Sequence, residues 1–307
     1  NSLADMKILH GKEISYNNLN DIQGALDSLK DLNRFGVSVI KHSNPCGLAE
    51  ADDQLTALKL AWAGDPVSAF GSIIAFNKKV ELETVEFFEL NNEDKSKRKF
   101  VEVVIAPSFS DEAFKYLQFH KNLRIVEFDS NHCRSESDMK FLHNSLLVQD
   151  SDISLHNKTE LVTEKKFDLK KGKKLMEFGI KAMRQVKSNS IVLVREATKG
   201  NFQLLGMGAG QPNRLISTSL AIAKATENLT NEFEGEDIIK YYDEQFGKAI
   251  LVSDAFFPFP DNVVKAAQAG IRTIVQPGGS IKDKKVIAAC NKLDVAMIFT
   301  GIRHFKH

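Results

Sequence analysis

Val37-Ser-Val-Ile-Lys-His-Ser-Asn-Pro-Cys-Gly47 joins a short apolar run to a polar turn. The short run at residues 37–40, followed by turn residues, predicts a buried strand. In open α/β sheets, ligands bind beyond the carboxyl ends of the strands, so Lys41 and His42 are candidate functional residues. A His titrates near neutral pH and can accept a proton, and a Lys can stabilise developing negative charge. The alternative is a plain strand-to-helix turn with two solvated side chains, and the motif taken alone favours it.

Short apolar runs of the same kind recur along the chain and alternate with segments of helical period. The expected strands cover residues 37–40, 72–76, 101–106, 191–194, 249–252, 273–275 and 295–299. The expected helices cover residues 55–63, 110–118, 215–225, 262–269 and 284–293. Strands that alternate with helices are typical of α/β proteins with mostly parallel sheets, so this is the fold class that we predict.

A polar stretch from Asp129 to Lys174, rich in Ser, Asp and Lys, separates two halves of similar size. The chain has 307 residues. At about 150 residues per domain, that length suits two domains. We therefore expect a first subdomain over residues 1–155 and a second over residues 156–307.

Composition excludes several classes of protein. The 41 Lys and Arg residues are balanced by 40 Asp and Glu residues, so the chain lacks the cationic excess of a general nucleic-acid or membrane binder. No apolar run approaches the roughly 20 residues of a membrane span, and the first residues contain no apolar signal segment. Cys46, Cys133 and Cys290 form neither a disulfide framework nor a Cys-x-x-Cys motif. We expect a cytoplasmic protein with no nucleic-acid or membrane partner.

A glycine-rich segment, Gly206-Met-Gly-Ala-Gly-Gln-Pro-Asn-Arg214, precedes a helical pattern that starts at Leu215. It lacks the third Gly of the dinucleotide fingerprint and the Gly-Lys-Ser/Thr of a Walker loop. Its glycines, with Arg214 at the start of a helix, still outline an anion site, because backbone N–H groups and helix N-termini attract negative charge. A tight turn that requires a positive φ explains the glycines equally well.

Three further segments are candidates for binding. Ser253-Asp-Ala-Phe-Phe-Pro-Phe-Pro-Asp-Asn262 is a stiff apolar loop that can form a wall for a flat aromatic ligand, although a hydrophobic plug between domains is the alternative. Gln276-Pro-Gly-Gly-Ser280 suggests another backbone cradle. The closing Arg303-His-Phe-Lys-His307 is typical of a solvated chain end.

Zinc and hydrolase motifs are absent from the sequence. Only Pro45-Cys46 of the zinc-deaminase signature is present, and no two histidines have the spacing of a zinc-binding helix. The Gly-x-Ser-x-Gly elbow of hydrolases is missing as well. We therefore expect no zinc.

Seven motifs, taken together and in order, resemble one known family. They are Lys41-His-Ser-Asn-Pro-Cys-Gly47, Asp65-Pro-Val-Ser-Ala-Phe-Gly71, Lys187-Ser-Asn189, Gly206-Met-Gly-Ala-Gly-Gln211, Ser253-Asp-Ala-Phe-Phe-Pro-Phe259, Gln276-Pro-Gly-Gly-Ser280 and Arg303-His-Phe-Lys-His307. The family is the AICAR transformylase part of a bifunctional purine enzyme. It formylates 5-aminoimidazole-4-carboxamide ribonucleotide (AICAR) and cyclises the product to IMP. The resemblance extends from about Leu9 to His307.

The resemblance implies a fold, substrates and an assembly. The fold would be two cytidine-deaminase-like α/β/α subdomains without the deaminase zinc. The substrates would be AICAR and 10-formyltetrahydrofolate, and the active sites would lie between the subunits of a homodimer. A monovalent cation, such as potassium, would lie near Ser190, Asp254 and His307.

The resemblance also implies roles for individual residues. His42 would be the catalytic base and Lys41 would stabilise the formyl oxyanion. Asn189 would hold the carboxamide, and Phe256 and Arg303 would lie beside the imidazole. The other positions that match ligand contacts of the family are Asn18, Gly71, Glu102, Arg214 and Asp261.

Two departures from the family pattern change these expectations. Pro260 occupies the place where many members have Arg. The segment expected just upstream of Leu9, with an Arg that helps to bind the phosphate, and the cyclohydrolase domain are not in this sequence, so we expect a carboxy-terminal fragment of a longer enzyme. The alternatives are another formyltransferase on the same fold and a fragment that dimerises and binds folate without turnover.

Overall fold

The computed structural model describes residues 2–129 and 137–307. The elements of the first half are η1 (Leu3–Asp5), β1 (Lys7–His10), α1 (Tyr16–Leu29), β2 (Phe35–Lys41), β3 (Asn44–Ala51), α2 (Gln54–Trp62), α3 (Pro66–Ala69), β4 (Ser72–Phe76), α4 (Leu82–Val85), η2 (Glu86–Phe88), η3 (Lys95–Lys97), β5 (Val101–Ala106), α5 (Asp111–Leu117) and β6 (Arg124–Glu127). Those of the second half are β7 (Ser137–Leu142), β8 (Ser145–Asp150), β9 (Glu160–Leu161), α6 (Leu169–Arg184), β10 (Ile191–Thr198), β11 (Asn201–Gly208), α7 (Arg214–Glu232), α8 (Ile238–Lys248), β12 (Ile250–Ser253), α9 (Asp261–Gln268), β13 (Thr273–Gln276), α10 (Asp283–Lys292) and β14 (Ala296–Phe299).

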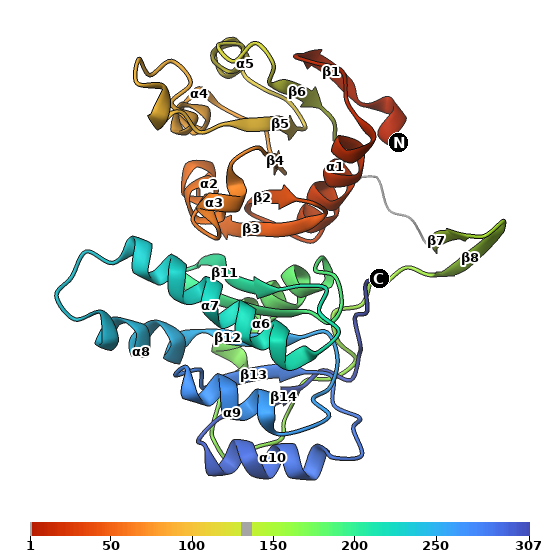
Figure 1. Cartoon of the computed structure of the whole chain (residues 1–307), viewed down its shortest axis with the longest axis vertical. Coiled ribbons are helices and arrows are strands. Elements are labelled where there is room, and N and C mark those ends of the chain that lie inside the picture. The colour runs from red at the N-terminus through yellow and green to blue at the C-terminus, as the bar shows by residue number, and fades with distance from the viewer. Residues whose placement is uncertain (1, 130–136) are drawn as a thin grey trace.

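The two halves share one order of elements (Figure 1). The shared order starts at α1 in the first half and at α6 in the second half. Each of these helices is followed by an antiparallel hairpin, β2–β3 or β10–β11, and a second helix, α2 or α7. Each half then adds a block of parallel strands, β4-β5-β6 or β12-β13-β14. The chain is thus of the predicted α/β class, with parallel pairing in these two blocks and antiparallel pairing elsewhere in the main sheet.

One continuous sheet runs through both halves. Its strand order is β1-β6-β5-β4-β2-β3-β11-β10-β12-β13-β14-β9 within the described residues. The halves meet where β3 pairs antiparallel with β11, with Glu50 opposite Phe202 and Ala49 opposite Gln203. Backbone hydrogen bonds therefore join the two expected subdomains directly.

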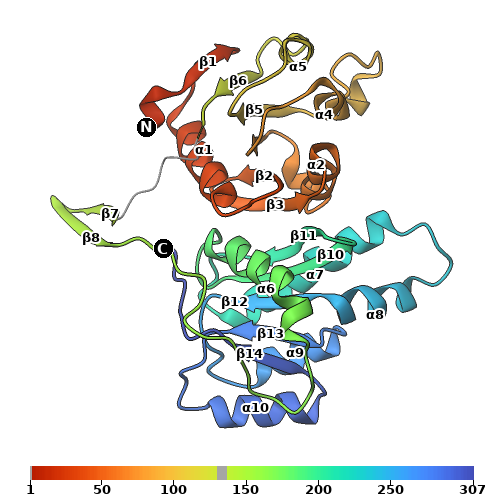
Figure 2. The same ribbon diagram turned by 180° about the vertical axis from the view of Figure 1, so that it is seen from behind.

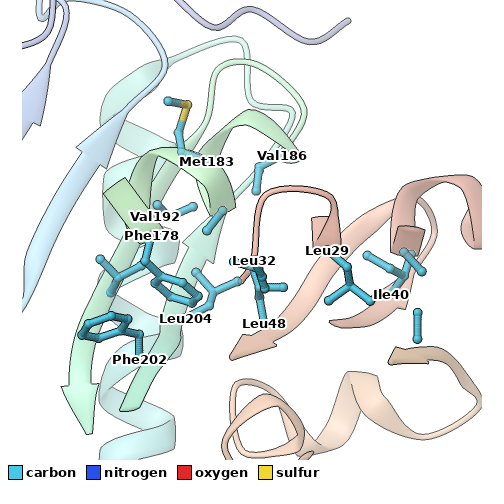
Figure 3. Packing of buried hydrophobic residues seen from close by; sticks show 14 of the residues in the cluster. Leu29, Leu32, Ile40, Leu48, Phe178, Met183, Val186, Val192, Phe202 and Leu204 are labelled. Carbon is cyan, nitrogen blue, oxygen red and sulfur yellow. The ribbon is translucent and has the colours of Figure 1, made fainter. Parts of the chain in front are cut away.

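Buried apolar residues form three clusters on the two faces of this sheet. One cluster contains residues of α1, α6 and both hairpins, so it is shared by the two halves. Figure 3 shows Leu32 and Leu48 of the first half beside Leu204 of the second half. The other two clusters lie under α2, α4 and α5 in the first half, and under α7 to α10 in the second.

A two-stranded hairpin, β7–β8, projects away from both halves (Figure 2). It lies within the stretch 129–174 that the sequence suggested as a domain connection. That stretch also contains β9 and the start of α6, while residues 130–136, Cys133 among them, lie outside the described residues. Helix α6 was not expected, because its first turns contain lysines that resemble a solvated run. Its apolar side chains, such as Phe178 and Ile180, are buried nonetheless.

The turn predicted after Ile40 differs from the structure in one respect. Residues 44–47 belong to strand β3 of a hairpin and do not lead into a helix. Pro45 is tolerated there because the register shifts between Val39 and Ile40, at the kind of irregularity where a sheet accepts Pro. Within the described ranges, no helix is long and apolar enough to cross a membrane.

The glycines of the Gly206–Gly210 segment are explained mainly by packing. Gly206 and Gly208 belong to β11, and helix α7 lies directly against them. A Cβ atom on Gly208 would lie 2.0 Å from the carbonyl oxygen of Ser217. Only Gly210 has a positive φ, of 66°. The two strand glycines therefore allow the helix to approach the sheet, and the backbone cradle suggested by the sequence is not formed by them.

Gly208→Ala is expected to lower the free energy of unfolding by about 1–3 kcal/mol, because helix α7 must move away from the sheet. Gly247→Ala in α8 is the matched control, since a Cβ atom there meets no other atom within 4 Å. It should raise the free energy of unfolding by up to about 1 kcal/mol. Urea unfolding of the three proteins measures both effects, and equal stability of the two variants would contradict the packing explanation.

Candidate functional site

The predicted site residues lie along one edge of the sheet. Lys41 ends β2 and is paired with Asn44, the first residue of β3. Because β3 and β11 are antiparallel, the start of β3 and the end of β11 point to the same edge. Ile191, at the start of β10, is opposite both Gly208 and Ser253, at the ends of β11 and β12. The Lys187 backbone N–H also donates to Asn44 Oδ1 at 3.4 Å, so the edge is continuous between the halves.

A cavity of about 500 Å³ opens at the second-half part of this edge. Five of the predicted residues line it, which are Asn189, Arg214, Phe256, Asp261 and Arg303. The remaining lining residues are Pro212, Asn213, Leu215, Ala255, Pro258, Phe259, Asn262 and Phe305. Motifs up to 114 residues apart in sequence thus form one pocket, and each of its residues belongs to the second half.

Arg214 is fixed by a buried carboxylate. It is the first residue of α7, and its Nη1 donates to Asp254 Oδ1 and to Ser253 Oγ, the latter at 3.1 Å. Asp254 is fully buried and also accepts from Ser188 Oγ at 2.6 Å and from the Ser190 N–H at 3.1 Å. The charge of Arg214 is therefore largely neutralised within the protein, and its side chain is held rigidly.

Asn189 is held by the same network. Its Oδ1 accepts from Arg214 Nη2 at 2.6 Å, and its Nδ2 donates to the carbonyl oxygens of Gln211 at 2.8 Å and Pro212 at 3.2 Å. Both N–H groups of the amide are thus in use. An amide oxygen can accept two hydrogen bonds, so Asn189 is available to a ligand only as an acceptor.

Aromatic side chains form the walls of the pocket. The guanidinium carbon of Arg303 lies 4.8 Å from the centre of the Phe256 ring, and Lys282 Nζ lies 3.7 Å from the centre of Phe259. Such cation–π contacts favour the stacking of each cation on its ring by about 0.5–1 kcal/mol at exposed sites. The Phe- and Pro-rich loop therefore lines a pocket, as one of its two interpretations predicted. Arg303 and Phe305 of the tail line it too. The tail taken alone suggested a solvated chain end, whereas the resemblance implied a ligand contact for Arg303.

His42 lies in a strained turn. His42 and Ser43 have φ values of 51° and 61° and form the two-residue loop of the β2–β3 hairpin. Two consecutive positive φ values match a type I′ turn, which normally selects Asn and Gly. The Asp21 carboxylate accepts from both backbone N–H groups, at 3.2 Å and 2.7 Å. This leaves the His42 side chain exposed at the edge of the sheet, on a tightly held backbone.

Lys41 reaches across to the start of β4. Its Nζ donates to the carbonyl oxygens of Phe70 at 3.1 Å and Gly71 at 2.8 Å. An ammonium group has three N–H donors, so one remains for a ligand. Gly71 has a φ of 69°, and a Cβ atom there would lie 3.2 Å from Lys41 Nζ. Gly71 is therefore needed both for its backbone conformation and for the position of the lysine.

Asn18 and Glu102 form a separate pair. Asn18 is nearly buried, caps helix α1 together with Ser15, and donates from Nδ2 to Glu102 Oε2 at 3.1 Å. Asn18, Lys41, His42, Gly71 and Glu102 are called the first-half group below. None of them is among the residues that line the pocket.

Sequence reasoning missed the residues that hold these side chains in place. Asp21 belongs to no motif that the sequence offered. Ser188 and Phe305 lie within two of the seven motifs, but neither was singled out as a site residue. Asp21 had no visible signal, because its partners become its neighbours only when α1 packs beside the hairpin. Lys187-Ser-Asn189 did contain Ser188, but its hydrogen bond to Asp254 depends on the pairing of β10 with β12.

Two buried cysteines and a buried serine bear on thiol and metal chemistry. Burial raises the pKa of the Cys46 thiol to about 12, and burial does the same for Cys290. Neither cysteine is therefore a thiolate at neutral pH.

No multidentate metal site is evident in the described ranges. Among the residues described by the structure, no group of three or more His, Cys, Asp and Glu side chains is placed to hold a metal ion. Ser190 Oγ is buried without a hydrogen-bond partner, a feature that fits a monovalent cation.

The fold and the pocket define a mixed α/β protein with a cavity at the edge of its central sheet. The chain belongs to the AICARFT/IMPCHase bienzyme family, whose sequence pattern matches residues 1–224. The chain is similar to proteins described as bifunctional purine biosynthesis protein PurH. Identity is 42% with that of Acetivibrio thermocellus, over 98% of this chain and 54% of the relative. Identity is 39% with the protein of Persephonella marina, over 100% of this chain and 54% of the relative. The chain thus spans about half the length of these relatives.

Proposed function

We propose that this chain transfers the formyl group of 10-formyltetrahydrofolate to AICAR in purine biosynthesis. The observation that carries the proposal is the convergence of Asn189, Arg214, Phe256, Asp261 and Arg303 in one cavity, because the family resemblance assigns these second-half positions to ligand contact. The relatives are bifunctional, and this chain matches about half of each. We assign it the transformylase step and place the cyclohydrolase step on the part that it does not match.

The pocket suits a flat ring that carries a carboxamide. Phe256 offers an aromatic face against which an imidazole can stack, and Arg303 lies beside that face. Asn189 Oδ1 can accept a hydrogen bond from the carboxamide N–H₂. The N-terminus of α7, a helix of 19 residues, adds a favourable potential for negatively charged groups.

The first-half group supplies the chemistry. The amine nitrogen of AICAR attacks the formyl carbon, and His42 accepts the amine proton. The carbonyl oxygen becomes an anion, which the free N–H of Lys41 stabilises. The bond from the formyl carbon to N10 then breaks, N10 takes a proton, and tetrahydrofolate leaves while the formyl group stays on AICAR. No step here involves a cation at Ser190, because Arg214 already neutralises Asp254.

A homodimer in the cytoplasm would complete the site. The reacting amine must be within hydrogen-bond reach of His42 while its ring lies against Phe256. Strands β2 and β10 are separated by three strand spacings, or roughly 14 Å. We therefore propose that the first-half group of one subunit faces the pocket of its partner, with each half forming a cytidine-deaminase-like subdomain. The boundary between the halves is placed near residues 155 and 156.

Co-expression of two inactive variants tests this arrangement. Lys41→Ala removes the first-half cation and Arg303→Ala disrupts the pocket, and two different affinity tags allow the mixed dimer to be isolated. If the site lies between subunits, the mixed dimer contains one fully intact site and should show about half of the wild-type turnover with AICAR and 10-formyltetrahydrofolate.

The matched control combines Lys41→Ala with His42→Ala. Both substitutions lie in the first-half group, so neither site of that mixed dimer is intact and it should stay inactive. If the first mixture is also inactive, each site lies within one chain. A wild-type chain that binds 10-formyltetrahydrofolate in calorimetry yet gives no product with AICAR would contradict the proposed function.

A further inference from the structure

The C-terminal tail alternates between the pocket and the protein interior. Residues 303–307 have no regular secondary structure, and Arg303 and Phe305 both line the pocket. His304 faces the opposite way and is only 2% exposed. An extended chain places successive side chains on opposite sides, so the burial of His304 decides the side to which its two neighbours point.

His304 is held by three hydrogen bonds. Its Nδ1 lies 2.7 Å from Asp152 Oδ2, and its Nε2 lies 3.2 Å from the carbonyl oxygen of Leu155. Its backbone N–H donates to the carbonyl oxygen of Asp254 at 2.9 Å. Both ring nitrogens thus face acceptors of the stretch between β8 and β9, which connects the two halves. Figures 1 and 2 show the C-terminus beside that stretch.

We propose that Asp152 and His304 are positioning residues, which hold the tail so that Arg303 is presented to the nucleotide in the pocket. The inference rests on the proposed function for the identity of that nucleotide. It gives the stretch between the halves a part in the site, although neither Asp152 nor His304 lines the cavity.

The need for such an anchor follows from the nature of a chain end. Terminal residues are poorly ordered unless they are tied down. Beyond His304, the Lys306 N–H donates to Ser188 Oγ at 3.1 Å and the Lys306 carbonyl accepts from the Ser188 N–H at 2.9 Å. Arg303 itself is stacked on Phe256, a contact that is weak at exposed sites. Without the His304 side chain, these backbone contacts and the stacking on Phe256 would be left to hold Arg303, and we expect its side chain to become less well ordered.

A double-mutant cycle separates positioning from general stability. His304→Ala is expected to raise the dissociation constant of AICAR, measured by calorimetry, by roughly tenfold. In an Arg303→Ala background the same substitution should change it by less than about twofold, because its effect is transmitted through Arg303. Asp152→Asn should raise the dissociation constant of AICAR by a smaller factor, and again only when Arg303 is present. If His304→Ala raised the dissociation constant by the same factor in the wild type and in Arg303→Ala, its role would be merely structural and the proposal would be overturned.

Hydrogen exchange gives a readout that does not depend on AICAR. The backbone N–H groups of His304 and Lys306 are hydrogen bonded, so peptides covering the tail should exchange slowly in the wild type. His304→Ala and Asp152→Asn should speed that exchange by roughly tenfold or more. Unchanged exchange would overturn the anchor, whereas faster exchange in a chain that does not bind AICAR would support the anchor and contradict the proposed function.

Two controls complete the experiment. His156→Ala removes another His of the same stretch, whose Nε2 lies 3.6 Å from Glu177 Oε1 of α6, and should leave AICAR binding and tail exchange unchanged. His304→Asn keeps a donor near the position of Nδ1, toward Asp152. It should recover part of the affinity that His304→Ala loses, and the absence of any recovery would contradict the role assigned to Asp152.

Discussion

His42→Ala is expected to lower the turnover of AICAR with 10-formyltetrahydrofolate by roughly two to four orders of magnitude, which is the usual contribution of a general base. In the proposed reaction the attacking amine is conjugated with the carboxamide and is a poor nucleophile. Removal of the proposed proton acceptor should therefore slow the chemical step. Single-turnover kinetics at saturating substrate measures that step. Turnover near the wild-type level in a folded variant would assign His42 to the hairpin turn alone.

The backbone of His42 gives this prediction a second readout. At a φ of 51° the Cβ atom of a side chain crowds the backbone, whereas Gly has no Cβ atom and adopts this conformation readily. His42→Gly is therefore expected to lose turnover as His42→Ala does, while the free energy of unfolding rises by up to about 1 kcal/mol. Ser43→Gly is the matched control, because it relieves the neighbouring φ of 61° and leaves the imidazole in place. It should keep turnover within a few-fold of the wild type.

Arg214→Ala is expected to lower the free energy of unfolding by about 3–5 kcal/mol, because it leaves a buried carboxylate without its cation. Arg214 is 9% exposed and Asp254 is fully buried, so water cannot replace the lost charge. Urea unfolding at neutral pH measures the loss. As a control, Lys79→Ala removes one member of an exposed pair with Glu81, 3.1 Å apart, and should cost about 0–1 kcal/mol.

A double variant identifies the cause of that loss. In Arg214→Met with Asp254→Asn, both charges are absent, and the amide oxygen introduced by the second substitution can still accept from Ser188 and Ser190. This protein should be at least about 2 kcal/mol more stable than Arg214→Ala, because no charge is buried alone. A double variant as unstable as Arg214→Ala would mean that packing of the guanidinium, and not the charge of Asp254, stabilises this part of the fold.

Local sequence determined the class of fold and most of the elements near the site. Strands 72–76 and 101–106 occur as predicted, and the predicted helices differ from α2, α5, α7, α9 and α10 mainly at their ends. Apolar runs and turn residues are local signals, so the sequence carries them. Helices α1, α6 and α8 were not predicted, because their polar residues outweigh a narrow apolar face that becomes apparent only when it is buried.

The motifs likewise identified the candidate residues by their type, but they did not predict which of these residues lie together in space. Five of them line a cavity with walls from four separate segments, because the start of β10, the end of β12 and the tail lie at one edge of the sheet. The register of β3 against β11 places the first-half group on that edge too. No local pattern encodes a pairing between residues 50 and 202. That pairing is selected by the apolar cluster that α1 and α6 bury together.

The sequence by itself thus determined which residues could do chemistry, since a His, a Lys and an Arg keep their properties in any fold. Tertiary structure alone decided what holds them. Asp21 fixes the turn of His42, Asp254 fixes Arg214, and Asp152 fixes the tail through His304. The physical reason is that a hydrogen bond to a carboxylate needs contact within about 3 Å. Partners 21 to 152 residues apart reach that distance only in the folded chain.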